Sequence, residues 1–245
     1  MVSFPAGHRV GQAFPLLLAA AVTAGLIWLA RQPEMRMEAG LMILAGGLIG
    51  GRLGFAALHA PYFTTHPVEI AWLWQGGLSW VGAVVGATLA AAAAAWLTGT
   101  PAWALADALS VPMSVVALAS WTGCLVDACA FGHPVASSWA PLAYDSFGVL
   151  ARRWPTQAVG MIASGALLAA LVRREGWPLP AGVLGMGTLA VVAGSTTLLS
   201  LTRGDPSMLI GRLRVDTVAG GVVFLAAALT TAALGAQHRD RESDS

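Results

Sequence analysis

The sequence predicts an all-α polytopic membrane protein, a bundle of about seven transmembrane helices. Of its 245 residues, 57% are hydrophobic and only 10% are charged, and the mean hydropathy is +0.71. Soluble domains carry about 25% charged residues, so this composition excludes an ordinary soluble domain. The formal net charge of +1 indicates no strong surface field, and a nucleic-acid partner is not expected.

Seven apolar stretches are each long enough, at about 17–25 residues, to cross a bilayer. They are 13–30, 39–58, 78–97, 105–131, 156–172, 179–201 and 215–234. The first has no clear cleavage site and is expected to stay in the protein as a helix. With no soluble domain between the stretches, we expect a single transmembrane domain over residues 1–236. A charged, disordered cytoplasmic tail is expected at 237–245.

The loop between the second and third stretches is rich in proline and aromatic residues. It includes Tyr62, Trp72 and Trp74. Because tyrosine and tryptophan rings favour the depth of the lipid headgroups, we expect the segment Val68–Trp74 to lie in the membrane interface.

Arg52 is a charged residue within an otherwise apolar and glycine-rich run, 41–58. A charge near the centre of a membrane helix costs about 2.5–3.5 kcal/mol on insertion scales, so such a residue usually faces a polar cavity, a partner or a ligand. One interpretation is therefore a binding or catalytic site, with the neighbouring glycines allowing another helix or a headgroup to come close. The other is a structural arginine that pairs with Asp107 or Asp127.

The only two cysteines are Cys124 and Cys129. A spacing of five residues puts them on different faces of a helix, so a disulfide would need a break between them. Without a second pair or nearby histidines they make a poor metal site, and no metal is expected. We interpret them as helix-packing residues.

Five short motifs follow one another along nearly the whole chain. They are Gly50-Gly51-Arg52-Leu53-Gly54-Phe55, Trp74-Gln75-Gly76-Gly77-Leu78-Ser79-Trp80-Val81-Gly82, Ala106-Asp107-Ala108, Arg153-Trp154-Pro155-Thr156-Gln157 and Arg203-Gly204-Asp205-Pro206. In this order and spacing, the chain resembles the prolipoprotein diacylglyceryl transferase family.

The resemblance implies an activity and a location. Members of the family move a diacylglyceryl group from phosphatidylglycerol to the thiol of the lipobox cysteine in a preprolipoprotein peptide, and glycerol 1-phosphate leaves. They are multi-pass proteins of the bacterial inner membrane, with the N-terminus outside and the active cavity open to the outer leaflet. Phosphatidylglycerol and the peptide are the implied partners, and no cofactor is implied.

This chemistry requires a phosphate anchor, stabilisation of charge on the leaving phosphate, and removal of the thiol proton. By the resemblance, Arg52, Arg153 and Asp127 are the expected catalytic residues. The expected substrate-binding residues are Gly76, Gly77, Trp80, Trp121, His133, Gln157 and Arg203.

The chain also differs from the family pattern. Val81 stands where the family has a histidine, Trp121 stands where its signature has an arginine, and Trp154 replaces another histidine. These differences indicate a divergent member, and they leave open a second function, a catalytically inactive lipid- or lipoprotein-binding protein on the same scaffold. A transporter is the last alternative, because the sequence has no internal repeat.

Overall fold

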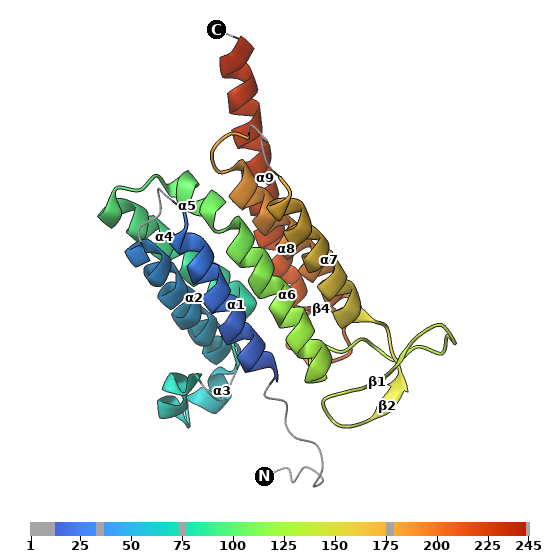
Figure 1. Cartoon of the computed structure of the whole chain (residues 1–245). Coiled ribbons are helices and arrows are strands. Elements are labelled where there is room, and N and C mark those ends of the chain that lie inside the picture. The colour runs from blue at the N-terminus through green and yellow to red at the C-terminus, as the bar shows by residue number, and fades with distance from the viewer. Residues whose placement is uncertain (1–12, 33–36, 74–76, 175–178, 244–245) are drawn as a thin grey trace. The chain divides into compact units, whose positions relative to one another are not determined.

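The computed structural model describes residues 13–32, 37–73, 77–174 and 179–243. It begins with the helices α1 (Ala13–Ala30), α2 (Met37–Leu58), α3 (Ala60–Phe63), η1 (Pro67–Ala71, a 3-10 helix), α4 (Trp80–Thr98), α5 (Ala102–Ala108) and α6 (Ser110–Val126) (Figure 1). The strands β1 (Leu142–Tyr144) and β2 (Leu150–Arg152) follow, and then the helices α7 (Thr156–Val172) and α8 (Val183–Ser200). The strands β3 (Leu209–Ile210) and β4 (Leu213–Arg214) and the helix α9 (Val215–Ser243) come last.

The predicted fold class is confirmed. Within the described residues, six helical segments are long and apolar enough to cross a membrane, namely Ala13–Ala30, Met37–Leu58, Trp80–Thr98, Ala102–Val126, Val183–Ser200 and Val215–Arg241. A seventh apolar helix, α7, is shorter at 17 residues. The strands form two small antiparallel hairpins, β1 with β2 and β3 with β4.

Several helix boundaries differ from those predicted. The fourth stretch is not one helix over 105–131. Leu109 separates α5 from α6, and α6 ends at Val126. After that end, Ala128 and Ala130 adopt positive φ angles of 54° and 50°, a left-handed backbone that ends a helix. At the other end of the chain, α9 continues to Ser243 and takes in residues 237–243 of the expected tail.

The chain divides into two compact units. One comprises Met1–Gly25, Val111–Glu175 and Val191–Gly221, and the other comprises Leu26–Ser110, Gly176–Ala190 and Val222–Ser245. The predicted site residues Arg52, Gly77 and Trp80 belong to the second unit. Those between Trp121 and Arg203 belong to the first.

Within the second unit, α2 and α4 pack through glycines. A Cβ placed on Gly50 would lie 2.7 Å from the Cα of Gly86, and one on Gly86 would lie 2.8 Å from the Cα of Gly50. Neither glycine therefore has room for a side chain. The glycines around Arg52 thus bring another helix close, one of the two possibilities that the sequence left open.

Candidate functional site

Arg52 lies on α2 with only 4% of its surface exposed, and it holds the loop that follows this helix. Its Nε donates a hydrogen bond to Ile70 O at 2.8 Å, Nη1 donates to Gly77 O at 3.2 Å, and Nη2 donates to Glu69 O at 2.5 Å. Each of these three acceptors is a backbone carbonyl.

The two carboxylates proposed as partners of Arg52 accept hydrogen bonds from backbone amides. Asp107 caps the start of α8, with Gly182 N at 2.7 Å and Gly185 N at 2.8 Å. Asp127 accepts from Phe14 N at 2.8 Å. Asp107 thus holds the segment that begins α8, and Asp127 holds the beginning of α1.

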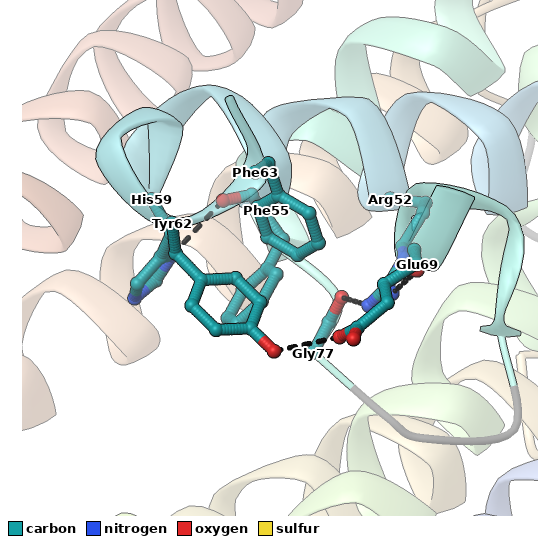
Figure 2. A pocket seen from close by; sticks show the side chains of 7 residues that line it. All are labelled: Arg52, Phe55, His59, Tyr62, Phe63, Glu69 and Gly77. Atoms are coloured by element: carbon teal, nitrogen blue, oxygen red, sulfur yellow. Dashed lines mark hydrogen bonds between the residues drawn. The ribbon is translucent and has the colours of Figure 1, made fainter. Parts of the chain in front are cut away.

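A cavity of about 320 Å³ opens beside Arg52 at the C-terminal end of α2. Its lining residues are Arg52, Phe55, His59, Tyr62, Phe63, Glu69 and Gly77 (Figure 2). The guanidinium carbon of Arg52 lies 5.8 Å from the centre of the Phe55 ring and 5.4 Å from that of Phe63, within the range of cation–π attraction. The cavity therefore combines a buried cation with aromatic walls.

Tyr62 and Glu69 form a polar pair in the wall of this cavity. The Tyr62 hydroxyl donates to Glu69 Oε2 at 2.7 Å, and Figure 2 shows the phenol pointing at this carboxylate. That hydrogen bond, followed by lost solvation and the negative charge of Glu69, raises the pKa of Tyr62 above its ordinary 10.0. Tyr62 therefore stays protonated at neutral pH and orients the carboxylate.

Gly77 lines the cavity at a backbone angle φ of +77°. A Cβ there would lie 2.5 Å from Cε1 of Phe55, so a larger residue would both strain the backbone and collide with the ring.

Trp80 is the first residue of α4, one position after the N-cap Ser79, and its buried indole N–H has no hydrogen-bond partner among the described residues. Gly76, the other predicted binding glycine, lies outside those residues.

In the first unit, backbone pairing brings together three predicted residues that are far apart in sequence. His133 N donates to Thr202 O at 2.9 Å, next to Arg203, and Trp154 N, next to Arg153, donates to His133 O at 3.1 Å. The segment around His133 therefore lies between the segments that carry Arg153 and Arg203.

Arg153 is buried, at 5% exposure, and paired with a carboxylate. Its Nη2 donates to Asp145 Oδ2 at 2.7 Å, its Nη1 donates to Gly132 O at 3.4 Å, and its guanidinium carbon lies 4.8 Å from the centre of the Phe131 ring. The ion pair joins Arg153 to the middle of the 132–155 loop region and neutralises the arginine charge, and the bond to Gly132 links the two ends of that region.

Arg203 belongs to a cluster of two arginines and two aspartates. It donates to both carboxylate oxygens of Asp205, at 2.8 and 2.6 Å, and Arg214 contacts the same carboxylate at 3.1 Å. Burial acts to raise the pKa of Asp205, but the hydrogen bonds and charge of Arg203, with the charge of Arg214, outweigh it and lower this pKa. Burial lowers the pKa of Arg203, but the bonds and charge of Asp205, with Asp216, raise it overall. Arg203 and Asp205 therefore both stay ionised near neutral pH.

The remaining predicted residues pack at the end of α6. Trp121 is buried, and a Cβ on Gly160 would collide with its indole ring, so α6 and α7 are in close contact here. Gln157 donates from Nε2 to Cys129 O at 2.9 Å. The Trp121 side chain thus fills space between two helices.

The interpretation of Cys124 and Cys129 as helix-packing residues is wrong. The two form a disulfide, with their Cα atoms 4.5 Å apart. Helix α6 ends between them and Cys129 N donates to Cys124 O at 3.0 Å, which supplies the break that a five-residue spacing requires. In the parts of the chain that the structure covers, no three His, Cys, Asp or Glu residues gather in a way that could hold a metal ion.

Besides the apolar Phe55 and Phe63, the sequence reasoning missed three polar residues of the cavity, His59, Tyr62 and Glu69. A signal was available for the first, because Arg52, Phe55 and His59 are spaced at i, i+3 and i+7 and so share one helix face. His59 was missed because it lies outside the five motifs.

Comparison with known proteins agrees with the membrane fold and the order of the motifs. A sequence model described as prolipoprotein diacylglyceryl transferase matches residues 8–233. Proteins named phosphatidylglycerol–prolipoprotein diacylglyceryl transferase from Bordetella avium and Methylocella silvestris are each 29% identical to this chain, over 69% and 68% of it and over 64% and 61% of their own lengths. One of the same name from Ruegeria pomeroyi is 31% identical over 62% of this chain and 55% of its own.

These matches span about three fifths of the length of those relatives. The family match, in contrast, runs through all five motifs and through nearly every helix of the structure. The chain therefore belongs to the prolipoprotein diacylglyceryl transferase family.

Proposed function

We propose that this protein transfers a diacylglyceryl group from phosphatidylglycerol to the thiol of a lipobox cysteine in a preprolipoprotein peptide. The observation that carries the proposal is the buried Arg52 in the wall of the aromatic cavity. Every relative named above is called a transferase of this kind. The comparisons therefore favour an enzyme over a catalytically inactive lipid-binding protein.

The cavity suits the headgroup of the lipid. Its volume of about 320 Å³ is at the lower end of the ~300–1,000 Å³ usual for ligand sites, which fits a phosphoglycerol group and leaves the acyl chains outside. Exposed apolar side chains, Leu53 on α2 and Val68 and Leu73 on the following loop, are suited to contact with acyl chains. The charge of Arg52 attracts the phosphate and opposes the negative charge that grows on it as the carbon–oxygen bond breaks.

Arg153 and Arg203 belong to the other compact unit and are not among the residues that line the cavity. Both are paired with aspartates, Asp145 and Asp205, in the structure. A phosphate would have to compete with these carboxylates. We therefore assign the ordering of the loops to Arg153 and Arg203, and we assign the anchoring of the phosphate to Arg52 because it lines the cavity.

We also propose that the C-terminal end of α6 faces the outside of the bacterial inner membrane. Disulfides persist in oxidising compartments, and Cys124–Cys129 lies at this end. Two candidate spans, Trp80–Thr98 and Ala102–Val126, separate the end of α2 from the end of α6, so both ends face the same side. The Arg52 cavity would then open outward, toward the secreted peptide.

The proposal is tested by two linked experiments. The gene is expressed in a strain depleted of its own diacylglyceryl transferase, and the purified protein is incubated with phosphatidylglycerol and a lipobox peptide. We expect growth with lipidated lipoprotein, and a peptide whose mass increases by the diacylglyceryl group. Folded protein that yields neither, but still binds vesicles of phosphatidylglycerol, would overturn the proposal in favour of the inactive lipid-binding protein.

A further inference from the structure

The proposed reaction needs a group that removes the proton of the acceptor thiol, because the thiolate is the nucleophile. Valine occupies position 81, so no base is available there. We propose that His59 is the general base of this reaction. This inference rests on the proposed transferase function and adds a catalytic residue to it.

His59 lines the same cavity as Arg52. It directly follows α2, seven residues after Arg52 and four after Phe55, so the three lie on one face of the helix. Figure 2 places His59 at one end of the group of lining side chains, with Arg52 and Glu69 at the other. A phosphate drawn toward Arg52 and a thiol entering past His59 would thus meet within one cavity.

The hydrogen bonding of His59 determines which ring nitrogen is basic. Nδ1 lies 2.9 Å from the carbonyl oxygen of Phe55. Because a carbonyl oxygen only accepts hydrogen bonds, Nδ1 carries the hydrogen and the neutral ring keeps its lone pair on Nε2. A general base needs this free lone pair.

The ring of His59 is also held in place while remaining accessible. It stacks on Phe55, with ring centres 4.1 Å apart and planes at 30°. The residue is exposed, and in the described part of the chain the hydrogen bond of its ring is made by Nδ1 and not by Nε2. A thiol from a peptide can therefore approach the basic nitrogen without displacing a protein partner.

The step balances as follows. Nε2 of His59 takes the proton of the cysteine S–H, and the thiolate sulfur attacks the glycerol carbon that bears the phosphate ester. The new carbon–sulfur bond forms as the carbon–oxygen bond breaks, and the bonding electrons leave with the phosphate oxygen of glycerol 1-phosphate. The imidazolium then returns its proton to the phosphate or to water.

A second histidine offers a matched control. His66 also stacks on an aromatic ring, that of Tyr62, with ring centres 4.6 Å apart, and its Nδ1 lies 2.8 Å from Thr65 Oγ1 and 3.3 Å from Tyr62 O. It is exposed as well, but it does not line the cavity. Replacing each histidine with asparagine keeps a donor near the position of Nδ1 and removes Nε2.

The experiment compares the purified wild-type protein, His59→Asn and His66→Asn in the lipobox peptide assay. We expect kcat to fall at least ~100-fold in His59→Asn, the usual contribution of general base catalysis, with KM for phosphatidylglycerol within about twofold of wild type. His66→Asn should keep the wild-type rate. Elution of each variant from a sizing column checks that it folds, and His59→Gln serves as a second variant if His59→Asn does not.

The outcomes separate this inference from the function on which it depends. An inactive wild-type protein would overturn both. An active wild type with an equally active His59→Asn would overturn the role of His59 alone. A loss confined to KM in His59→Asn would also overturn it, because it would indicate a residue that shapes the lipid site without moving a proton.

Discussion

The Nε of Arg52 donates a hydrogen bond of 2.8 Å to the carbonyl oxygen of Ile70, which joins the interior of α2 to the loop eighteen residues further along the chain. Two further bonds, to Glu69 O and Gly77 O, attach the same loop at two more points. One buried cation therefore organises the segment that encloses the cavity. Its charge is also the feature of that cavity best suited to a phosphate.

Replacing Arg52 with alanine should affect the loop and the reaction together. It leaves three partly buried carbonyl groups without these donors, at about 1 kcal/mol each, and removes the charge beside the phosphate. We expect the transfer rate to fall at least ~100-fold and the loop to become more sensitive to protease. Arg173→Ala, at an exposed arginine that ends α7, is the control and should keep the wild-type rate. An unchanged rate in Arg52→Ala would remove this residue from the site.

Gly86→Ala should weaken the contact between α2 and α4. The added Cβ would meet the backbone of Gly46 and Gly50, which cannot move aside as a flexible side chain would. We expect the free energy of unfolding to fall by about 3 kcal/mol, as in an overpacked core. Gly235→Ala makes the same change in α9, where nothing lies within 4 Å of the new Cβ, and should stabilise the protein by up to about 1 kcal/mol. Thermal unfolding in detergent measures both, and equal shifts would contradict the packing argument.

The double replacement of Cys124 and Cys129 by alanine should lower the free energy of unfolding by about 2 kcal/mol, the chain-entropy value for a loop this short. A dithiol reductant should produce a similar loss in the wild type and none in the variant. If the reductant leaves the melting temperature of the wild type unchanged, the disulfide does not contribute to stability.

Asp205→Asn should destabilise the loop cluster, because it leaves Arg203 and Arg214 side by side without the carboxylate that both contact. We expect a loss of about 2 kcal/mol, below the ~3–5 kcal/mol of a fully buried pair since Asp205 is 16% exposed. Asp216→Asn is the matched control. Its contacts with the same arginines are 3.7 and 4.0 Å, so it should cost less than about 1 kcal/mol. A larger loss in Asp216→Asn would contradict the central place of Asp205.

The same carboxylate should give stability a particular pH dependence. The pKa of Asp205 is lower in the folded protein than its ordinary 3.8, so folding favours the ionised form. This contribution is complete above 3.8 and is lost as the pH falls below that value through the folded pKa. The difference in melting temperature between wild type and Asp205→Asn should therefore be largest near neutral pH and shrink in strong acid. A difference in melting temperature that does not change with pH would indicate that the charge of Asp205 is not its cause.

Much of the fold follows from local pattern. The apolar stretches predict the helices because a backbone within lipid must satisfy its hydrogen bonds internally, and the glycines around Arg52 predict a close helix neighbour. The helix break at Leu109 and the turn after Val126 were missed. The turn after Val126 depends on single backbone angles, such as the positive φ of Ala128, which a run of apolar residues does not reveal.

The candidate site was likewise predicted only in part. The order of the motifs identified the family and directed attention to Arg52, Arg153 and Arg203, because residue types at fixed spacings are a property of the sequence. Whether each arginine faces a cavity or an aspartate depends on which distant segments meet it.

By itself, therefore, the sequence determined that this is a multi-pass helical membrane protein of one transferase family. Only the tertiary structure decided that Arg52 binds carbonyls beside a cavity, that Arg153 pairs with Asp145, and that the two cysteines are joined. The physical reason is the separation along the chain over which each effect acts. Hydropathy and spacing act along neighbouring residues, whereas the state of a charge or a thiol depends on partners that folding brings within a few ångströms.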